Sequence, residues 1–346
     1  MRSANKALLM IFPLSLAALI LISFDNCSKK ESSPAELFQS FSLVETESED
    51  YAISSVTKID FSSDKIFIFD KRQKRIFTLS DTFSFLYTIG SPGQGPGELD
   101  DPVDFAVGEY KIIVLERFPR RLDIFDLTGD FIGRVNLKIP EEISYSYPSG
   151  ILPGPENSYL ITYSLSSHLL DVYDDRGNYQ TTWLQREDPV VIGRKNIGNE
   201  SAIRYSAGSK SILHFSLLKG EFSEIYPDGS AGRRFRIPDK ALQKLARELR
   251  SSFEQDAQAS NIQLDVISFI LYTSFCVDEE DRLYVAQFRL EAGSQGQKLW
   301  VFNPDGKCQS GSLALPGGEK LKDLYFWKGQ FFLVSDQEQI WVTKRK

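Results

Sequence analysis

The side chains that most often carry out chemistry are few in this chain of 346 residues, and they lie far apart. Only two histidines are present, His168 and His214. A zinc site built from three imidazoles is therefore excluded. The sequence shows no recognisable pairing of a nucleophile with a general base and no metal-binding triad. We therefore predict no catalytic residues and no metal ligands. On these grounds an enzyme is the less favoured interpretation.

Polar side chains recur where short apolar segments end. Three of these positions are acidic: Asp70, Glu116 and Asp336. If such carboxylates converge, they could bind calcium, so calcium is a possible cofactor. Arginines and a histidine follow in the adjacent loops. Because loops on a rigid scaffold often carry binding residues, we predict that one set contacts a ligand or partner: Asp70, Arg72, Glu116, Arg117, Arg120, His168, Gln287 and Asp336.

These residues are embedded in a repeating pattern of an apolar strand, a turn with Asp or Gly, and a second strand. Asp-Gly and related pairs supply the positive φ angles that tight hairpins need. The pattern occurs four times, with a weaker fifth copy, at residues 124–131, 172–179, 225–230, 301–307 and 77–83.

Further strand-like segments lie upstream of each hairpin, which gives units of about four strands at a spacing of roughly 45–50 residues. Four-stranded units at this period are typical of propeller blades. Six units fit the chain. The sixth ends after its third strand, at 339–343, and residues 38–44 could supply the missing strand and close the ring. We therefore predict an all-β fold, a six-bladed β-propeller whose N-terminal strand completes the last blade.

One insertion breaks the period. Between 239 and about 258, apolar side chains recur at helical spacing, and Asp239 is a suitable N-cap. This segment is the one convincing helix in the sequence. It either packs against a blade edge or presents a surface to a partner.

The N-terminus indicates export. Arg2 and Lys6 precede an apolar run, residues 7–22, that is too short to span a bilayer comfortably. Cys27 follows at once and begins a polar stretch. This arrangement resembles a bacterial lipoprotein, which implies a signal peptide over 1–26, a lipidated Cys27 and a polar tether over 27–36, with the propeller over 37–346. Plain secretion is the alternative.

The segment Ile89–Leu99, which reads I-G-S-P-G-Q-G-P-G-E-L, resembles the signature that links blades in NHL-type six-bladed propellers. It is most similar to exported, often lipidated bacterial members with a G-x-G-P-G-E-[FL] segment. The resemblance covers roughly residues 38–346 and implies a propeller. Some members of this family are enzymes, namely a lyase with histidine-bound zinc and lactonases that use calcium. Because the chain has only two histidines, it cannot form the histidine-bound zinc site of the lyase members.

The net charge is −7, so nothing draws the chain towards nucleic acid. Cys276 and Cys308 could form at most one disulfide. We expect a monomeric, non-catalytic exported propeller, held at a membrane by lipidated Cys27, in the periplasm or at the cell surface. Its ligand would be a protein or a small molecule or glycan. The alternative is an NHL- or lactonase-like hydrolase or lyase with calcium on the propeller axis.

Overall fold

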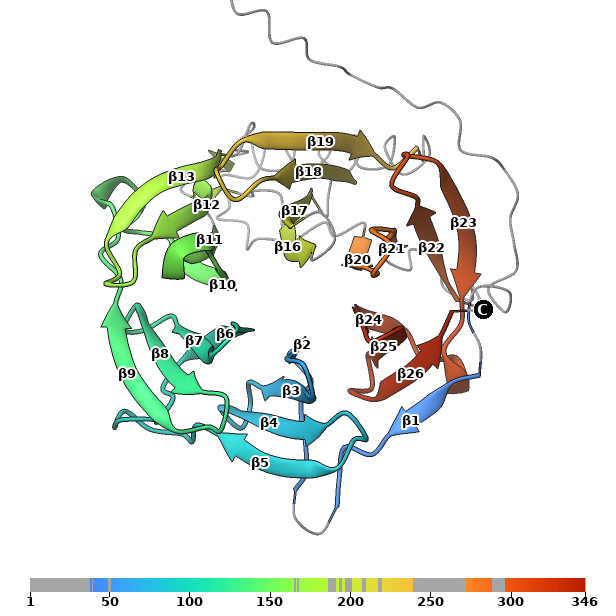
Figure 1. The fold of residues 1–346 in the computed structure, drawn as a ribbon, viewed down its shortest axis with the longest axis horizontal. Helices are drawn as coiled ribbons and strands as arrows, with labels where there is room; N and C mark the ends of the chain where they lie inside the picture. The colour runs from blue at the N-terminus through green and yellow to red at the C-terminus, as the bar shows by residue number, and fades with distance from the viewer. Residues whose placement is uncertain are drawn as a thin grey trace, which may run out of the picture.

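The computed structural model describes residues 38, 40–48, 51–164, 166, 168–185, 191–192, 195–196, 201–206, 210–216, 220–238, 272–287 and 296–345. These residues form six four-stranded antiparallel sheets that surround a common axis (Figure 1). The predicted six-bladed β-propeller is thus confirmed. The predicted leader, Cys27 and the helix over 239–258 lie outside the described residues.

Each blade is a meander in which the first strand is innermost. The first three blades contain β2 (Lys58–Phe61), β3 (Lys65–Asp70), β4 (Arg75–Ser80) and β5 (Phe85–Ile89); β6 (Pro102–Val107), β7 (Lys111–Glu116), β8 (Arg121–Asp126) and β9 (Phe131–Asn136); and β10 (Tyr147–Pro153), β11 (Tyr159–Ser164), β12 (His168–Tyr173) and β13 (Tyr179–Gln185).

The remaining blades follow the same plan. They contain β16 (Ser201–Ser206), β17 (Ser211–Ser216), β18 (Glu221–Ile225) and β19 (Ala231–Arg236); β20 (Tyr272–Val277), β21 (Leu283–Gln287), β22 (Gln297–Phe302) and β23 (Cys308–Leu313); and β24 (Leu321–Trp327), β25 (Gln330–Ser335), β26 (Ile340–Lys344) and β1 (Ser42–Val44). A hairpin of β14 (Val191–Ile192) and β15 (Lys195–Asn196) and three short 3₁₀ helices complete the described elements: η2 (Glu141–Ile143), η3 (Pro155–Asn157) and η4 (Pro316–Gly318).

The hairpins that the turn pattern predicts join the third and fourth strands of the blades. In the second blade, Gly129 has a φ of 95° at such a turn. The Asp126 carboxylate accepts hydrogen bonds from the backbone N–H groups of Thr128 and Asp130, at 2.8 and 2.9 Å. Local turn chemistry therefore sets the strand register, as expected for Asp and Gly at these positions.

The ring is closed by its N-terminal strand. β1 pairs antiparallel with β26, so that Val44 lies opposite Ile340, and an isolated bridge joins Phe38 to Arg345. The Phe38 side chain is 3% exposed and its ring lies 5.0 Å from that of Phe331, in an edge-on arrangement. The prediction that a strand from this end completes the last blade is confirmed.

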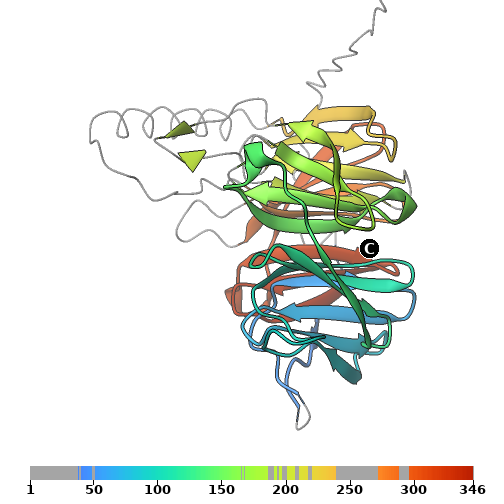
Figure 2. The same cartoon turned by 90° about the vertical axis from the view of Figure 1, so that its left-hand side faces the viewer.

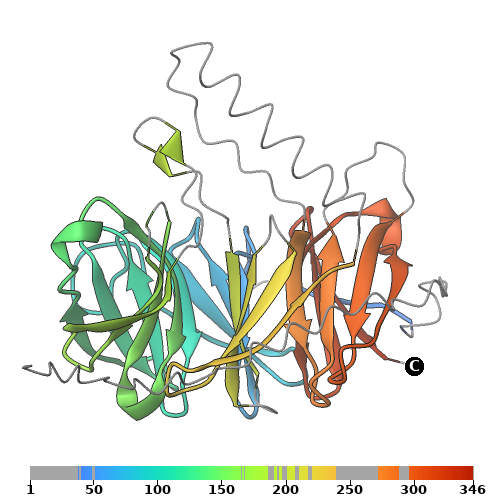
Figure 3. The ribbon, with the colours of Figure 1, turned by 90° about the horizontal axis from the view of Figure 1, so that it is seen from above.

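Side views of the ring show two faces that carry the connections between strands (Figures 2 and 3). One face carries the loops between the second and third strands together with the connections between blades, and we call it the loop face. The hairpin β14–β15 stands out from it. The segment Ile89–Leu99 also lies there, folded back so that the Leu99 N–H donates to the Ser91 carbonyl at 2.7 Å. Gly90 has a φ of 76°, and a Cβ atom there would lie 2.6 Å from Leu99.

Apolar side chains from neighbouring blades form the core. Between the first and second blades, the rings of Phe69 and Phe105 lie 6.0 Å apart and are fully buried. Cys276 is a buried free thiol in the fifth blade, so it does not form a disulfide with Cys308. No helix among the described residues is both long enough and apolar enough to cross a membrane.

Candidate functional site

The acidic residues predicted at the strand ends serve the loops that surround them. The Asp70 carboxylate is buried and accepts five hydrogen bonds from Ser54, Ser55 and Gln73, between 2.7 and 3.1 Å. The Glu116 carboxylate is also buried and accepts the N–H groups of Asp100 and Asp101, each at 3.0 Å. These two carboxylates thus anchor the chain that leads into their own blades.

The Asp70 hydrogen bonds predict a specific dependence on pH. Burial alone would raise the pKa of Asp70, but the hydrogen bonds from Gln73 and Ser54 outweigh it, and the pKa lies below its usual range. A lowered pKa in the folded state stabilises the fold at pH values above the unfolded-state pKa of about 3.9, and this stabilisation is lost as the pH falls through the folded-state pKa. Asp70→Asn should therefore lower the free energy of unfolding by about 1.5–3 kcal/mol at neutral pH.

Urea unfolding at pH 7 and at acidic pH checks this expectation. The difference between wild type and variant should shrink as the pH falls below the normal titration range of an aspartate. An equal difference at both pH values would contradict the role of the ionised carboxylate.

The other predicted residues are spread over five blades, and only Arg117 and Arg120 share a loop. Within the described part of the chain, no hydrogen bond or ion pair joins these residues across blades. Arg72 and Asp336 are exposed, and Asp336 accepts the N–H of Lys320 at 3.0 Å. His168 contacts Asp171 and Thr182 within its own blade, with Nδ1 at 3.2 and 3.1 Å from their oxygens. The side-chain oxygen of Gln287 is buried and has no partner among the described residues.

Polar side chains that the sequence interpretation missed meet on the propeller axis. They come from innermost strands of five blades, and we call them the axial ring: Lys58, Asp60, Asp104, Arg204, Ser274, Asp323 and Tyr325. Lys58 Nζ lies 2.9 Å from Asp104 in the next blade. Arg204 Nη2 lies 3.2 Å from Asp323, two blades away. Because the fifth blade lies between them, these two side chains can meet only if both point towards the axis.

A repeated backbone irregularity explains the convergence. The register slips by one residue immediately before Asp104, Ser274 and Asp323, each on the innermost strand of its blade. Such β-bulges redirect side chains. Ser274 then donates to Asp323, which also accepts a hydrogen bond from the Tyr325 hydroxyl. The three bulges thus place equivalent residues of three blades around one opening.

The axial charges combine burial with access to solvent. Asp104 and Lys58 are each 14% exposed, and Arg204 and Asp323 are 24% and 20% exposed. Burial alone would lower the pKa of Arg204, but Asp323, Tyr325 and the carboxylates of Asp104 and Asp60 together outweigh it, so the pKa lies above its usual value and Arg204 stays charged. Burial raises the pKa of Asp60, which accepts the N–H of Val107 at 2.9 Å. Solvent therefore reaches a ring of fixed charges.

Some axial contacts also join neighbouring blades. Asp104 accepts the N–H of Ile151 in the third blade at 2.8 Å, and Lys58 Nζ donates to the Phe105 carbonyl at 2.6 Å. The Nε atom of Arg204 is different, because it is buried and has no hydrogen-bond partner among the described residues. An unpaired buried donor costs about 1–3 kcal/mol.

Exposed aromatic side chains lie together on the loop face. Phe118, Tyr145 and Tyr147 are 49%, 57% and 37% exposed, and the rings of Phe118 and Tyr147 lie 5.1 Å apart. Arg117 and Arg120, both predicted from the sequence, flank these rings. We call these five residues the aromatic rim. Tyr147 begins β10, the innermost strand that also supplies Ile151 to Asp104.

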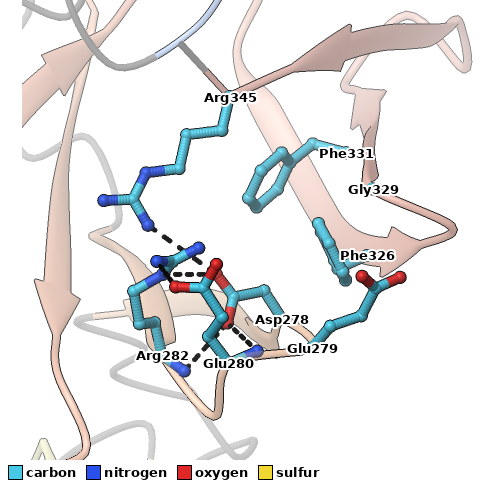
Figure 4. Close-up of a pocket in the computed structure, with 8 residues that line it drawn as sticks. All are labelled: Asp278, Glu279, Glu280, Arg282, Phe326, Gly329, Phe331 and Arg345. Atoms are coloured by element: carbon cyan, nitrogen blue, oxygen red, sulfur yellow. Dashed lines mark hydrogen bonds and ion pairs between the residues drawn. The ribbon is translucent and has the colours of Figure 1, made fainter.

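A small pocket lies on the opposite face, between the fifth and sixth blades (Figure 4). Arg282 and Arg345 point towards Asp278, and Phe326 and Phe331 form an apolar wall. Asp278 already accepts hydrogen bonds from Arg282 Nε at 2.6 Å and from the backbone N–H groups of Glu280 and Arg282. Its carboxylate is therefore engaged in fixing its own loop.

Comparisons with known proteins agree on the fold. A family model described as a six-bladed β-propeller matches residues 17–182. Comparison with curated proteins gave no match. A solved structure of a Bacteroides fragilis protein assigned as exported is 13% identical, with a TM-score of 0.61, and the match covers 92% of this chain and 98% of that one.

Two further solved structures are similar. A Bacteroides vulgatus protein of the DUF4221 family is 11% identical, with a TM-score of 0.60 over 90% of this chain and 97% of that one. Virginiamycin B lyase from Staphylococcus aureus is 11% identical, with a TM-score of 0.52 over 85% of this chain and 83% of that one. At these identities the likeness concerns the fold alone, and propellers host many functions.

Proposed function

We propose that this chain is a non-catalytic exported propeller, held at a membrane through lipidated Cys27, that binds a ligand where the axial ring opens to the loop face. The observation that carries the proposal is the convergence of charged side chains from several blades on an axis that solvent can reach. The similarity to a propeller assigned as exported supports the location, as does the basic and apolar N-terminus.

The energetics of the ring favour a binding role. Replacing a buried ion pair by uncharged residues of similar size is often neutral or stabilising. The pair of Arg204 and Asp323 is thus not needed for a stable blade interface. A partly exposed charged pair is suited to a small polar ligand that accepts a hydrogen bond from Arg204 and donates one to a carboxylate.

The calcium-dependent alternative lacks a specific observation in its favour. Calcium needs six to eight oxygen ligands, whereas Asp104 and Asp323 each face a basic side chain. No group of three or more His, Cys, Asp or Glu side chains arranged to hold a metal occurs in the described part of the chain. Because Asp104 and Asp323 are already paired with basic side chains, we do not propose a metal-dependent reaction.

A thermal-shift screen of the purified protein tests the proposal. The panel contains galacturonate, glucose, glutamate, lysine and calcium, with a chelator as a separate arm. A ligand present at a hundred times its dissociation constant adds about 2.7 kcal/mol of stability, which should raise the melting temperature by about 5 °C. An organic hit supports the proposal. A shift with calcium alone, reversed by the chelator, would favour the alternative, and no shift at all would count against binding of these classes.

A further inference from the structure

The aromatic rim offers a surface that differs in kind from the axial ring. Three aromatic side chains remain between 37% and 57% exposed within thirty residues of sequence, while most large aromatic side chains in this fold are packed between blades. The Phe118 and Tyr147 rings meet at 64° and form an angled apolar surface. The carbon-bound hydrogens of a sugar ring pack well on aromatic faces, because those faces carry partial negative charge.

The two arginines of the rim are not equivalent. Arg117 forms a two-pronged ion pair with Asp101, at 2.7 and 3.0 Å, and is neutralised by it. Arg120 Nη2 donates to the Ser144 carbonyl, and its Nε is buried without a hydrogen-bond partner. Among the described residues no carboxylate lies within ion-pair distance of Arg120. Its guanidinium lies 5.9 Å from the Tyr147 ring centre, so an uncompensated cation adjoins the aromatic surface.

The size of the surface helps to select the ligand class. An aromatic side chain presents roughly 200 Å² when fully exposed, so the three half-exposed rings offer about 300 Å². A stable protein interface needs roughly 800 Å² on each partner. The rim is too small to carry such an interface alone, but it matches two or three sugar rings. Arg120 has no ion-pair partner among the described residues and therefore favours a carboxylate, which guanidinium groups recognise in a two-pronged geometry.

We propose that the aromatic rim binds an acidic oligosaccharide, with sugar rings packed on Phe118, Tyr145 and Tyr147 and a uronate carboxylate paired with Arg120. This inference concerns a different set of residues from the axial ring. Substitutions in the rim and in the ring therefore separate the two proposals.

Calorimetric titration of the purified protein with tetragalacturonate tests the inference, with the methyl-esterified tetramer and a tetraglutamate peptide as matched probes. We expect binding of tetragalacturonate with a dissociation constant below about 1 mM, and at least about tenfold weaker binding of the ester and of the peptide. Phe118→Ala and Tyr147→Ala should each weaken binding at least about tenfold. Tyr110→Ala, at a 75% exposed tyrosine on the opposite face, is the control and should bind as wild type.

Arg120→Gln should bind the acid and the ester equally, and Arg120→Lys should keep part of the preference for the acid. Melting curves show whether each variant is folded. The inference is overturned if tetragalacturonate does not bind, if the folded rim variants bind it as wild type does, or if the peptide binds equally well. Loss of binding in the rim variants together with unchanged thermal shifts by a ligand of the axial ring would leave both proposals standing.

Discussion

Replacing Phe38 with alanine is expected to lower the free energy of unfolding by about 3–5 kcal/mol. Phe38 is 3% exposed, and its ring packs against Phe331 at 5.0 Å, in a cluster formed by the fifth and sixth blades. Its removal leaves a cavity at the junction where the two ends of the chain meet. Equilibrium unfolding in urea measures the loss.

Leu43→Ala is the matched control, because Leu43 lies on the closing strand β1 but is 50% exposed. Its effect should stay within about 0.5 kcal/mol. Equal losses in the two variants would show that any change near this terminus destabilises the protein. A negligible loss in Phe38→Ala would mean that the ring does not depend on closure by its N-terminal segment.

Replacing Asp323 with alanine should cost about 3 kcal/mol of unfolding free energy, because it leaves Arg204 as an unpaired buried charge. The same change removes the acceptor for Ser274 and Tyr325. The loss arises on the axis, so it should be accompanied by weaker protection of the innermost strands β16 and β24 against hydrogen exchange.

The exposed ion pair of Lys328 and Asp81 provides the comparison. Both side chains are 46% exposed, and their charged atoms lie 3.0 Å apart. Asp81→Ala should cost less than about 1 kcal/mol. If Asp323→Ala costs no more than Asp81→Ala, then the axial pair is effectively a solvated surface pair, and the premise of a partly buried charged ring is wrong.

The sequence predicts the architecture well because local chemistry repeats in every blade. Turns such as that at Asp126 and Gly129 fix hairpins of one length, and the apolar strands between them recur at a constant period. The number of predicted strands in each unit is enough to assign residues 38–44 as the missing fourth strand of the sixth unit. Both predictions hold because each rests on short-range rules that the ring as a whole does not override.

The axial ring could not be predicted in the same way. A β-bulge precedes Asp104 in β6 and another precedes Asp323 in β24, and a one-residue slip leaves no clear signal in a single sequence. The two segments share only an aspartate at the third residue of the innermost strand, Asp104 in β6 and Asp323 in β24. The charge of Asp70 and Glu116 at their strand ends predicts a binding role, but these carboxylates accept hydrogen bonds from their own loops. Those contacts depend on the three-dimensional path of each loop, which the sequence does not reveal.

The most direct test of the account is to compare wild type with the double variant Arg204→Met/Asp323→Asn, using the organic compound that stabilises wild type in the thermal-shift screen. The variant removes the charge pair but keeps an acceptor oxygen for Ser274 and Tyr325. We predict an unfolding free energy within about 1.5 kcal/mol of wild type, and loss of the ligand-induced rise in melting temperature. An equal rise in both proteins, or a variant as unstable as Asp323→Ala, would contradict the claim that the axial ring is maintained for binding.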